Sequence, residues 1–172
     1  MLRILNKLRK IGIVTEPLPA RERPALEGLG ERLGREIQGR FRGSLAIRHV
    51  DAGSCNGCEL EIHALNNAVY ALERFGVHFV ASPRHADMLL VTGPVSRHME
   101  AALRRTYEAM PAPKLVLAAG DCGADGGEFG VSYASCGGVT NVIPVDGVIR
   151  GCPPAPWDLV AGILEAIQRR DG

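Results

Sequence analysis

Cysteines are the residues of this chain best suited to chemistry. Two of them, Cys55 and Cys58, form a C-x2-C pair in the Gly-rich turn AGSCNGC. Such a pair is typical of a redox dithiol, half of a zinc site or half of an iron–sulfur site. Cys122 and Cys152 follow two further apolar segments, KLVLAAG and NVIPVDG. Together the four cysteines, spaced C-x2-C-x63-C-x29-C, indicate one site of four thiolates.

Four thiolates can bind Zn²⁺ or a cubane [4Fe–4S] cluster, and the neighbouring residues favour the cluster. Pro153 follows Cys152, as a proline follows the last ligand of many cluster motifs. Cys122 and Cys152 are single ligands, which is unusual for zinc. Glycines permit backbone angles at which N–H groups point at sulfur, and they flank the ligands at Gly53, Gly57, Gly120, Gly123 and Gly151. A zinc site of the same four cysteines stays open as the alternative. The fifth cysteine, Cys136, is expected to be a small buried residue outside the site.

The segments that carry these cysteines alternate between strand and helix patterns from residue 44 onward. Apolar runs predict strands over 44–53, 77–82, 86–93, 114–120 and 141–147. Helical spacing predicts helices over 59–74, 96–109 and 156–170, and a long Gly-rich loop is expected over 120–138. This alternation predicts an α/β fold with a mostly parallel sheet and helices on both faces. Since sites in open α/β sheets lie at the carboxyl ends of strands, three strand exits should bring the four cysteines together.

The N-terminal part of the chain differs from the rest in charge and pattern. Residues 1–50 hold eleven Lys or Arg and five Glu, a net charge of +6, whereas the remainder carries −5. Apolar positions at helical spacing predict a basic helix over residues 1–12, which Pro17 and Pro19 separate from the rest of the chain. A short helix is expected near 29–38. We therefore divide the chain into a basic N-terminal helix and extended arm, 1–43, and a cofactor-binding α/β domain, 44–172.

Four segments of the chain resemble the small-subunit family shared by [NiFe]-hydrogenases and respiratory complex I. They are IRHVDAGSCNGCELEIHALNN, ERFGVHFVASPRHADMLLVTGPVSRHM, GDCGADGGEFG and IPVDGVIRGCPPAP, and the resemblance spans roughly residues 44–165. Complex I members typically have adjacent cysteines at the first ligand position. The spacing SCNGC therefore resembles the hydrogenase side of the family, above all the membrane-bound energy-converting hydrogenases that include formate hydrogenlyase.

This resemblance implies a flavodoxin-like α/β domain that binds one [4Fe–4S] cluster through Cys55, Cys58, Cys122 and Cys152. It implies an oxidoreductase subunit that is not catalytic alone, because the cofactor carries the redox step. The expected partners are a ferredoxin-like two-cluster subunit and the catalytic large subunit of a [NiFe]-hydrogenase. A complex I-like quinone-reducing module is the alternative that the resemblance leaves open.

The resemblance also singles out residues beside the cysteines. Glu61 lies where related chains carry an acidic residue, so it is a candidate proton relay or a carboxylate favoured at a helix N-terminus. For Glu59 we expect only the second role. The chain reads RGCPPAP where many relatives read PGCPPRP, so Arg150 replaces a proline and Ala155 an arginine. Cluster ligation should survive both changes, whereas a contact made by the usual arginine would be lost.

The expected location depends on the N-terminus and on these partners. The N-terminal residues are charged throughout and lack the apolar region of a signal peptide, and no apolar run reaches the length of a membrane span. We expect a cytoplasmic protein, peripheral on the inner face of the cell membrane within a multisubunit complex. Its basic N-terminal helix would dock on a membrane subunit. Nucleic-acid binding is not expected, because it would need more basic surface on the domain itself.

Overall fold

The computed structural model describes residue 10 and residues 22–169. The basic helix expected over residues 1–12 lies outside the described residues, apart from Lys10. None of the helices in the described part of the chain is long and apolar enough to span a membrane.

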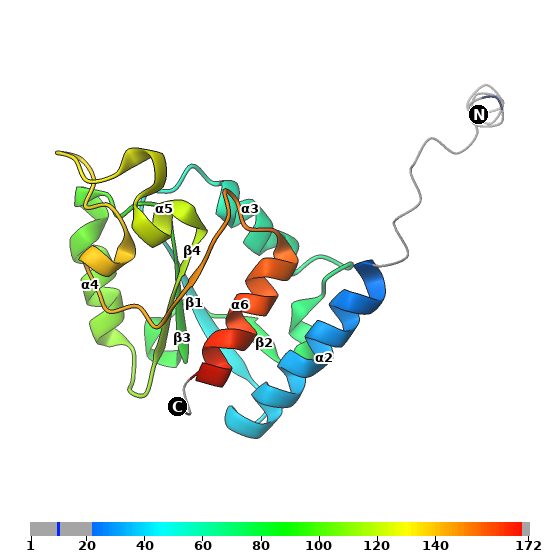
Figure 1. Ribbon diagram of the computed structural model, residues 1–172. Helices are drawn as coiled ribbons and strands as arrows, with labels where there is room; N and C mark the ends of the chain where they lie inside the picture. Colours follow the sequence, from blue (N-terminus) through cyan, green and yellow to red (C-terminus); the bar gives the residue numbers. More distant parts are fainter. Residues whose placement is uncertain (1–9, 11–21, 170–172) are drawn as a thin grey trace, which may run out of the picture.

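A five-stranded parallel sheet forms the centre of the molecule (Figure 1), with the strand order β2-β1-β3-β4-β5. Its strands are β1 (Leu45–Asp51), β2 (Val77–Phe79), β3 (Met88–Thr92), β4 (Leu115–Ala119) and β5 (Gly147–Ile149). Every residue of β3 and β4 is buried, as in the central strands of parallel sheets covered on both faces. This strand order is that of the flavodoxin-like fold, so the predicted fold class is confirmed.

Helices cover both faces of the sheet, and each face has its own hydrophobic core. On one face, α3 (Gly57–Ala64) and α6 (Pro156–Arg169) pack with α2 (Glu22–Arg40) against residues such as Leu90 and Leu117. On the other, α4 (Arg97–Ala109) packs against Leu89 and Val91. Successive residues of a strand point to opposite faces, which is why Leu89 and Leu90 belong to different cores.

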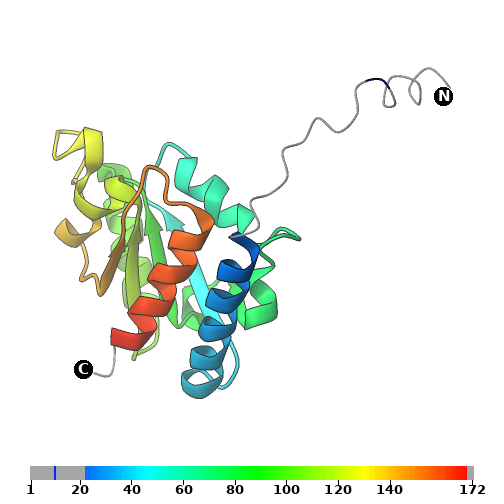
Figure 2. The same ribbon diagram turned by 45° about the vertical axis from the view of Figure 1, so that its right-hand side comes forward.

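Helix α2 corrects the expectation of a short helix in an arm outside the core. The helix has 19 residues, and its Leu33 and Ile37 are fully buried in the first core. It lies beside α6 (Figure 2), where Arg40 Nη1 donates a hydrogen bond of 2.7 Å to the carbonyl oxygen of Ile167. Residues 22–40 are therefore an integral layer of the α/β fold.

Three other elements differ from the expected ones. The helix after the cysteine pair ends at Ala64, because the Asn67 side chain accepts hydrogen bonds from the N–H groups of Val69 and Tyr70 and so favours a turn. The expected strand over 141–147 is wrong: the strand lies at 147–149, beyond Pro144, which removes a backbone donor. The expected loop over 120–138 begins with a short helix, α5 (Gly120–Asp125).

Four 3₁₀ helices complete the described chain, at Leu72–Phe75, Pro83–His85, Gly127–Phe129 and Val139–Asn141.

Candidate iron–sulfur centre

Three strands end beside the four predicted cysteine ligands. Strand β1 ends at Asp51, whose Oδ1 accepts hydrogen bonds of 2.8 Å from the N–H groups of Gly53 and Ser54 and so shapes the turn leading to Cys55. Strand β4 ends directly before α5, which places Cys122 in the first turn of that helix. Strand β5 ends three residues before Cys152. Because the strands are parallel, all three exits lie at one edge of the sheet, where Figure 1 shows α3 and α5.

The thiols at this edge lie within electrostatic range of one another. All are free, with Cys58 buried, Cys122 half-buried, and Cys55 and Cys152 exposed. Burial raises the pKa of Cys58 to about 12, and Glu59 and the other three thiols add to the rise. Burial also raises the pKa of Cys122, with contributions from Cys152 and Cys55. The four cysteines thus lie near one another at this edge, and Cys55 and Cys152 are open to solvent.

Glycines let the backbone approach the sulfurs closely. Gly120 has a φ of +82°, and a Cβ atom built there would lie 2.6 Å from Cys58 Sγ. Gly127 has a φ of +50°, and its Cβ would lie 2.9 Å from Cys122 Sγ. A side chain at either position would be strained and would displace a thiol. Cβ atoms at these glycines would fill the space beside the sulfurs, so the glycines keep the surroundings of Cys58 and Cys122 open.

The donor set fits a cubane cluster. Within the described residues, no group of three or more His, Cys, Asp or Glu side chains is arranged to hold a single metal ion. A [4Fe–4S] cluster does not require such a group, because each of its four thiolates binds a different iron atom. The cysteine sulfurs therefore surround the whole cluster and do not converge on a single ion. Four free thiols beside glycine-lined backbone are donors of the kind that such a cluster uses.

Arg150 joins two of the segments that hold cysteines. Its Nη1 lies 2.6 Å from Asp125 Oδ2 and 3.8 Å from Asp121 Oδ1. Asp121 in turn exchanges hydrogen bonds with Gly151: its N–H donates to the Gly151 carbonyl at 2.9 Å, and its Oδ1 accepts from the Gly151 N–H at 3.1 Å. These contacts tie the helix of Cys122 to the loop of Cys152.

A buried carboxylate beside the cysteines is Glu59, which lies in the first turn of α3, as expected, and makes further contacts there. Ser54 Oγ donates a hydrogen bond of 2.6 Å to Glu59 Oε2, and Thr92 Oγ1 donates a short one to Oε1. His49 Nε2 lies 3.0 Å from Thr92 Oγ1 and 3.7 Å from Glu59 Oε1, and burial lowers the pKa of His49. Glu61 is half-buried, and its carboxylate makes no hydrogen bond or ion pair with the part of the chain that the structure describes.

Cys136 lies outside the cysteine site, as expected of a small buried residue. It belongs to the core on the α4 face, and its thiol donates to Glu100 Oε2 at a distance of 3.4 Å. Burial raises its pKa, as does the hydrogen bond to Glu100. A thiol in these surroundings is a packing residue.

Known proteins are similar to this chain in sequence. Residues 55–166 match the family model described as NADH ubiquinone oxidoreductase, 20 Kd subunit. The chain is 42% identical to "Formate hydrogenlyase subunit 7" of Escherichia coli (strain K12) over 128 residues, which are 74% of this chain and 50% of that protein. It is 45% identical over 123 residues to "Probable membrane-bound hydrogenase subunit mbhJ" of Pyrococcus furiosus, covering 72% of this chain and 74% of that protein.

A solved structure is similar as well. It belongs to a membrane-bound sulfane sulfur reductase, described as an archaeal respiratory membrane complex. The match has a TM-score of 0.64 and 33% sequence identity, and it covers 82% of this chain and 77% of the other. The chain spans about half the length of the formate hydrogenlyase subunit. With the family model matched from the first predicted ligand into the last helix, the chain belongs to the family of the 20 kDa subunit of NADH–ubiquinone oxidoreductase and the small subunits of [NiFe]-hydrogenases.

Proposed function

We propose that this protein is an electron-transfer subunit carrying one [4Fe–4S] cluster on Cys55, Cys58, Cys122 and Cys152. It passes electrons between a ferredoxin-like two-cluster subunit and the catalytic large subunit of a membrane-associated [NiFe]-hydrogenase complex. The observation that carries the proposal is the delivery of four free thiols to one edge of the sheet by three strand exits. The hydrogenase-type spacing of Cys55 and Cys58 and the names of the relatives support the choice of complex.

The chemistry divides between the cofactor and the chain. When bound, the cluster supplies one-electron transfer. The chain's own residues fix its position and surroundings: Cys58 lies on the buried side, and Cys55 and Cys152 lie on the side open to solvent and to a partner. Gly120 and Gly127 keep side chains away from the thiols. In this proposal the subunit sets the position and the reduction potential of the cluster, while bond chemistry takes place in the large subunit.

The proposed location is the inner face of the cell membrane, with the N-terminal basic helix docked on a membrane subunit. The complexes named for the relatives support it, since both the Pyrococcus hydrogenase and the sulfane sulfur reductase are called membrane-bound. A complex I-like module that reduces quinone is the alternative, and the description of the matching family model favours keeping it. The neighbouring large subunit discriminates between the two: two C-x2-C pairs in its sequence would mean nickel–iron chemistry.

The cluster can be tested on anaerobically purified protein. We expect a brown protein with about four irons per chain and a reduced-cluster EPR signal. Replacing any of the four ligands with Ser should damage the cluster, whereas Cys136→Ala, the matched control, should leave it intact. A colourless protein with one zinc per chain would overturn the electron-transfer function, and full cluster content in Cys152→Ser would overturn the ligand assignment.

A further inference from the structure

The loop of residues 126–136, called here the apolar loop, presents large apolar side chains to solvent. Phe129 is 60% exposed, Val131 69% and Tyr133 97%. These are three of the seven large apolar side chains that the described residues leave exposed. Clustered exposure of this kind is typical of an interaction surface, since single exposed apolar residues are common but gathered ones are not.

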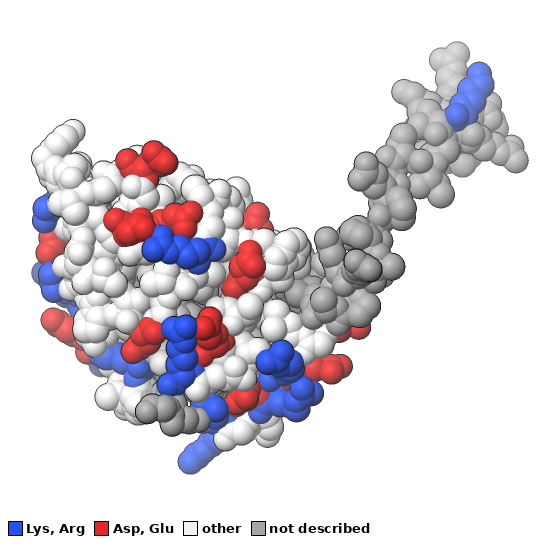
Figure 3. All heavy atoms as spheres, in the orientation of Figure 1, with Lys and Arg blue, Asp and Glu red and all other residues white. Residues whose placement is uncertain are grey.

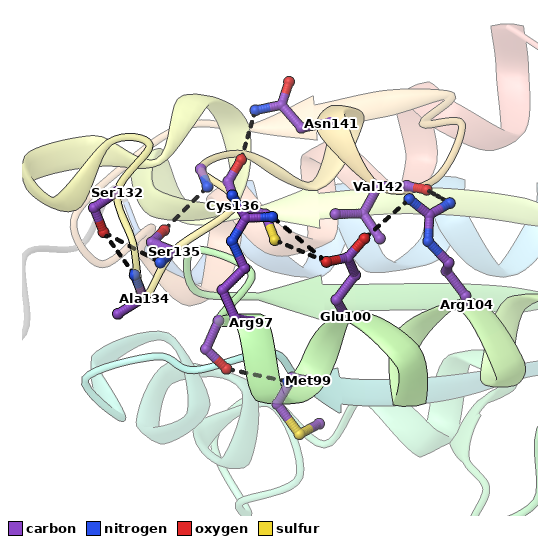
Figure 4. Close-up of polar contacts among 12 residues, drawn as sticks. Arg97, Met99, Glu100, Arg104, Ser132, Ala134, Ser135, Cys136, Asn141 and Val142 are labelled. Atoms are coloured by element: carbon purple, nitrogen blue, oxygen red, sulfur yellow. Dashed lines mark hydrogen bonds and ion pairs between the residues drawn. The ribbon is translucent and has the colours of Figure 1, made fainter.

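The apolar loop is held in its shape by its own hydrogen bonds (Figure 4). Ser132 Oγ accepts from the N–H groups of Ala134 and Ser135 at 3.3 and 3.2 Å. Ser135 Oγ donates to the carbonyl oxygen of Gly130 at 2.9 Å, and the N–H of Ser132 donates to the carbonyl oxygen of Ser135 at 2.9 Å. The loop therefore holds its exposed side chains outward without a partner present.

The base of the apolar loop is fastened to the body of the protein. The N–H of Cys136 donates to the Val95 carbonyl at 2.7 Å, and the N–H of Arg97 donates to the Ala134 carbonyl at 2.9 Å. Figure 4 shows Glu100 of α4 pointing toward Cys136, between Arg97 and Arg104. The ion pairs of Glu100 with these arginines measure 3.6 and 3.3 Å. A surface anchored in this way loses little conformational freedom when it binds, which favours affinity.

The apolar loop is continuous with the cysteine site. The N–H of Gly126 donates to the Cys122 carbonyl at 2.9 Å, and a Cβ atom on Gly127 would lie 2.9 Å from Cys122 Sγ. A protein seated on the loop would therefore also cover the side of the site next to Cys122. Electron transfer requires a redox partner close to the cluster, and this surface puts the partner there.

The charge around the apolar loop indicates the chemistry of that partner. Glu128 is exposed within the loop, and two aspartates precede it, the exposed Asp125 and the half-exposed Asp121. Arg150 pairs with both aspartates, so these four residues together carry a net negative charge. Figure 3 shows acidic side chains gathered on the upper part of this face, with a basic side chain beside them. A complementary surface has an apolar pocket for the aromatic side chains and Lys or Arg at its rim.

We infer that the apolar loop is a preformed docking arm for the catalytic large subunit, which seats Phe129, Val131 and Tyr133 in an apolar pocket edged by basic residues. This inference rests on the proposed function and adds to it the surface through which the subunit and its redox partner meet. The large subunit is the occupant because the loop begins at the wall of the cysteine site, where the electrons leave or enter.

The test compares a triple variant, Phe129→Ser with Val131→Ser and Tyr133→Ser, with the control Val69→Ser. Val69 is 61% exposed on the turn after α3, so its substitution removes a similar side chain elsewhere on the surface. Each full-length chain is co-expressed with its large subunit, and the affinity of the purified pair is measured together with iron content and EPR. We expect the triple variant to keep its cluster and to lose at least about tenfold in affinity for the large subunit. The control should bind as the unchanged chain does.

Binding of the triple variant within about twofold of the unchanged chain would overturn the inference. So would a loss confined to the ferredoxin-like subunit, or a loss of self-association with large-subunit binding intact, because the arm would then serve another occupant. A different result would overturn the proposed function. In that case the unchanged chain would contain no iron–sulfur cluster, whatever its affinity for a partner.

Discussion

Glu59 shows how one side chain can set the shape of a ligand turn. Its buried carboxyl group accepts hydrogen bonds from Ser54 and Thr92, as a buried polar group must find partners. Ser54 Oγ also accepts from the N–H of Asn56 at 3.1 Å, and Asn56 has a φ of 71°, in the left-handed region. The chain of contacts from Glu59 through Ser54 to Asn56 therefore fixes the backbone between Cys55 and Cys58.

Replacing Glu59 should loosen this turn. Glu59→Ala leaves two hydroxyl donors without their acceptor, so we expect the free energy of unfolding to fall by about 1–3 kcal/mol. Glu59→Gln keeps one acceptor oxygen and should cost less. Urea unfolding under anaerobic conditions measures the free energy of unfolding of both variants. The iron content should fall more in Glu59→Ala than in Glu59→Gln. Glu61→Ala is the control, with a change within about 0.5 kcal/mol. Equal effects of the Glu59 and Glu61 substitutions would refute this account of the turn.

At the scale of elements, α2 is the helix whose packing on the core is not predicted by the sequence pattern. Its buried apolar side chains, Leu33 and Ile37, lie four residues apart on one narrow stripe of a helix whose other positions include many Glu, Arg and Gly residues. The stripe packs against the core that α3 and α6 share. The helix thus stabilises the face of the sheet opposite α4, although it precedes the first strand.

Shortening a buried side chain of α2 tests this assignment. Leu33→Ala should lower the free energy of unfolding by about 2–5 kcal/mol, because it removes a fully buried side chain and leaves a cavity. Arg35→Ala, on the exposed side of the same helix, should change it by no more than about 0.5 kcal/mol. The two variants are compared by urea unfolding. If Leu33→Ala has no larger effect than Arg35→Ala, α2 is an arm outside the core after all.

The elements predicted well from sequence are those with a strong local pattern. Strands β3 and β4 are uninterrupted apolar runs, and α4 has a clear polar and apolar side, so each lies within a few residues of its predicted range. Helix α2 contains several glycines, which weaken a helical prediction. The structure gives two of them a packing role: Gly30 and Gly34 lie against Phe75, and a Cβ on Gly30 would come within 2.3 Å of its ring.

The same distinction between local and distant information applies to the site. The cysteines are conspicuous by type and spacing, so the sequence alone suffices to propose them. Glu59, on α3, becomes significant only through Thr92 of β3 and His49 of β1. The partners Glu59 and Thr92 are 33 positions apart, and no periodic pattern connects them. Such a network depends on the pairing of β1 with β3, which only the folded chain reveals.

At the scale of the whole molecule, the proposed chemistry is concentrated at one edge of a sheet whose interior is inert. The thiols lie at the exits of β1, β4 and β5, and the apolar loop lies beside them. Hydrogen bonds such as that from Asp121 to Gly151 connect these segments, but none of the five cysteines forms a disulfide. A bound cluster would link the three segments covalently, so binding energy would become folding energy at that edge.

Removal of the cluster should therefore loosen this edge and leave the centre of the sheet intact. We expect the melting temperature to fall by about 5 °C or more, since about 1 kcal/mol corresponds to roughly 2–4 °C for a chain of this size. Hydrogen exchange should accelerate in segments 52–58, 120–127 and 150–154, while the amides of β3 and β4 stay protected. The comparison is made between anaerobically purified protein and the same protein after chelation of its iron, with the Cys136→Ala variant as a control that responds equally. If hydrogen exchange accelerated evenly over both cores, the cluster would hold the whole sheet together. If hydrogen exchange did not accelerate at the three segments, these thiols would not hold a cluster.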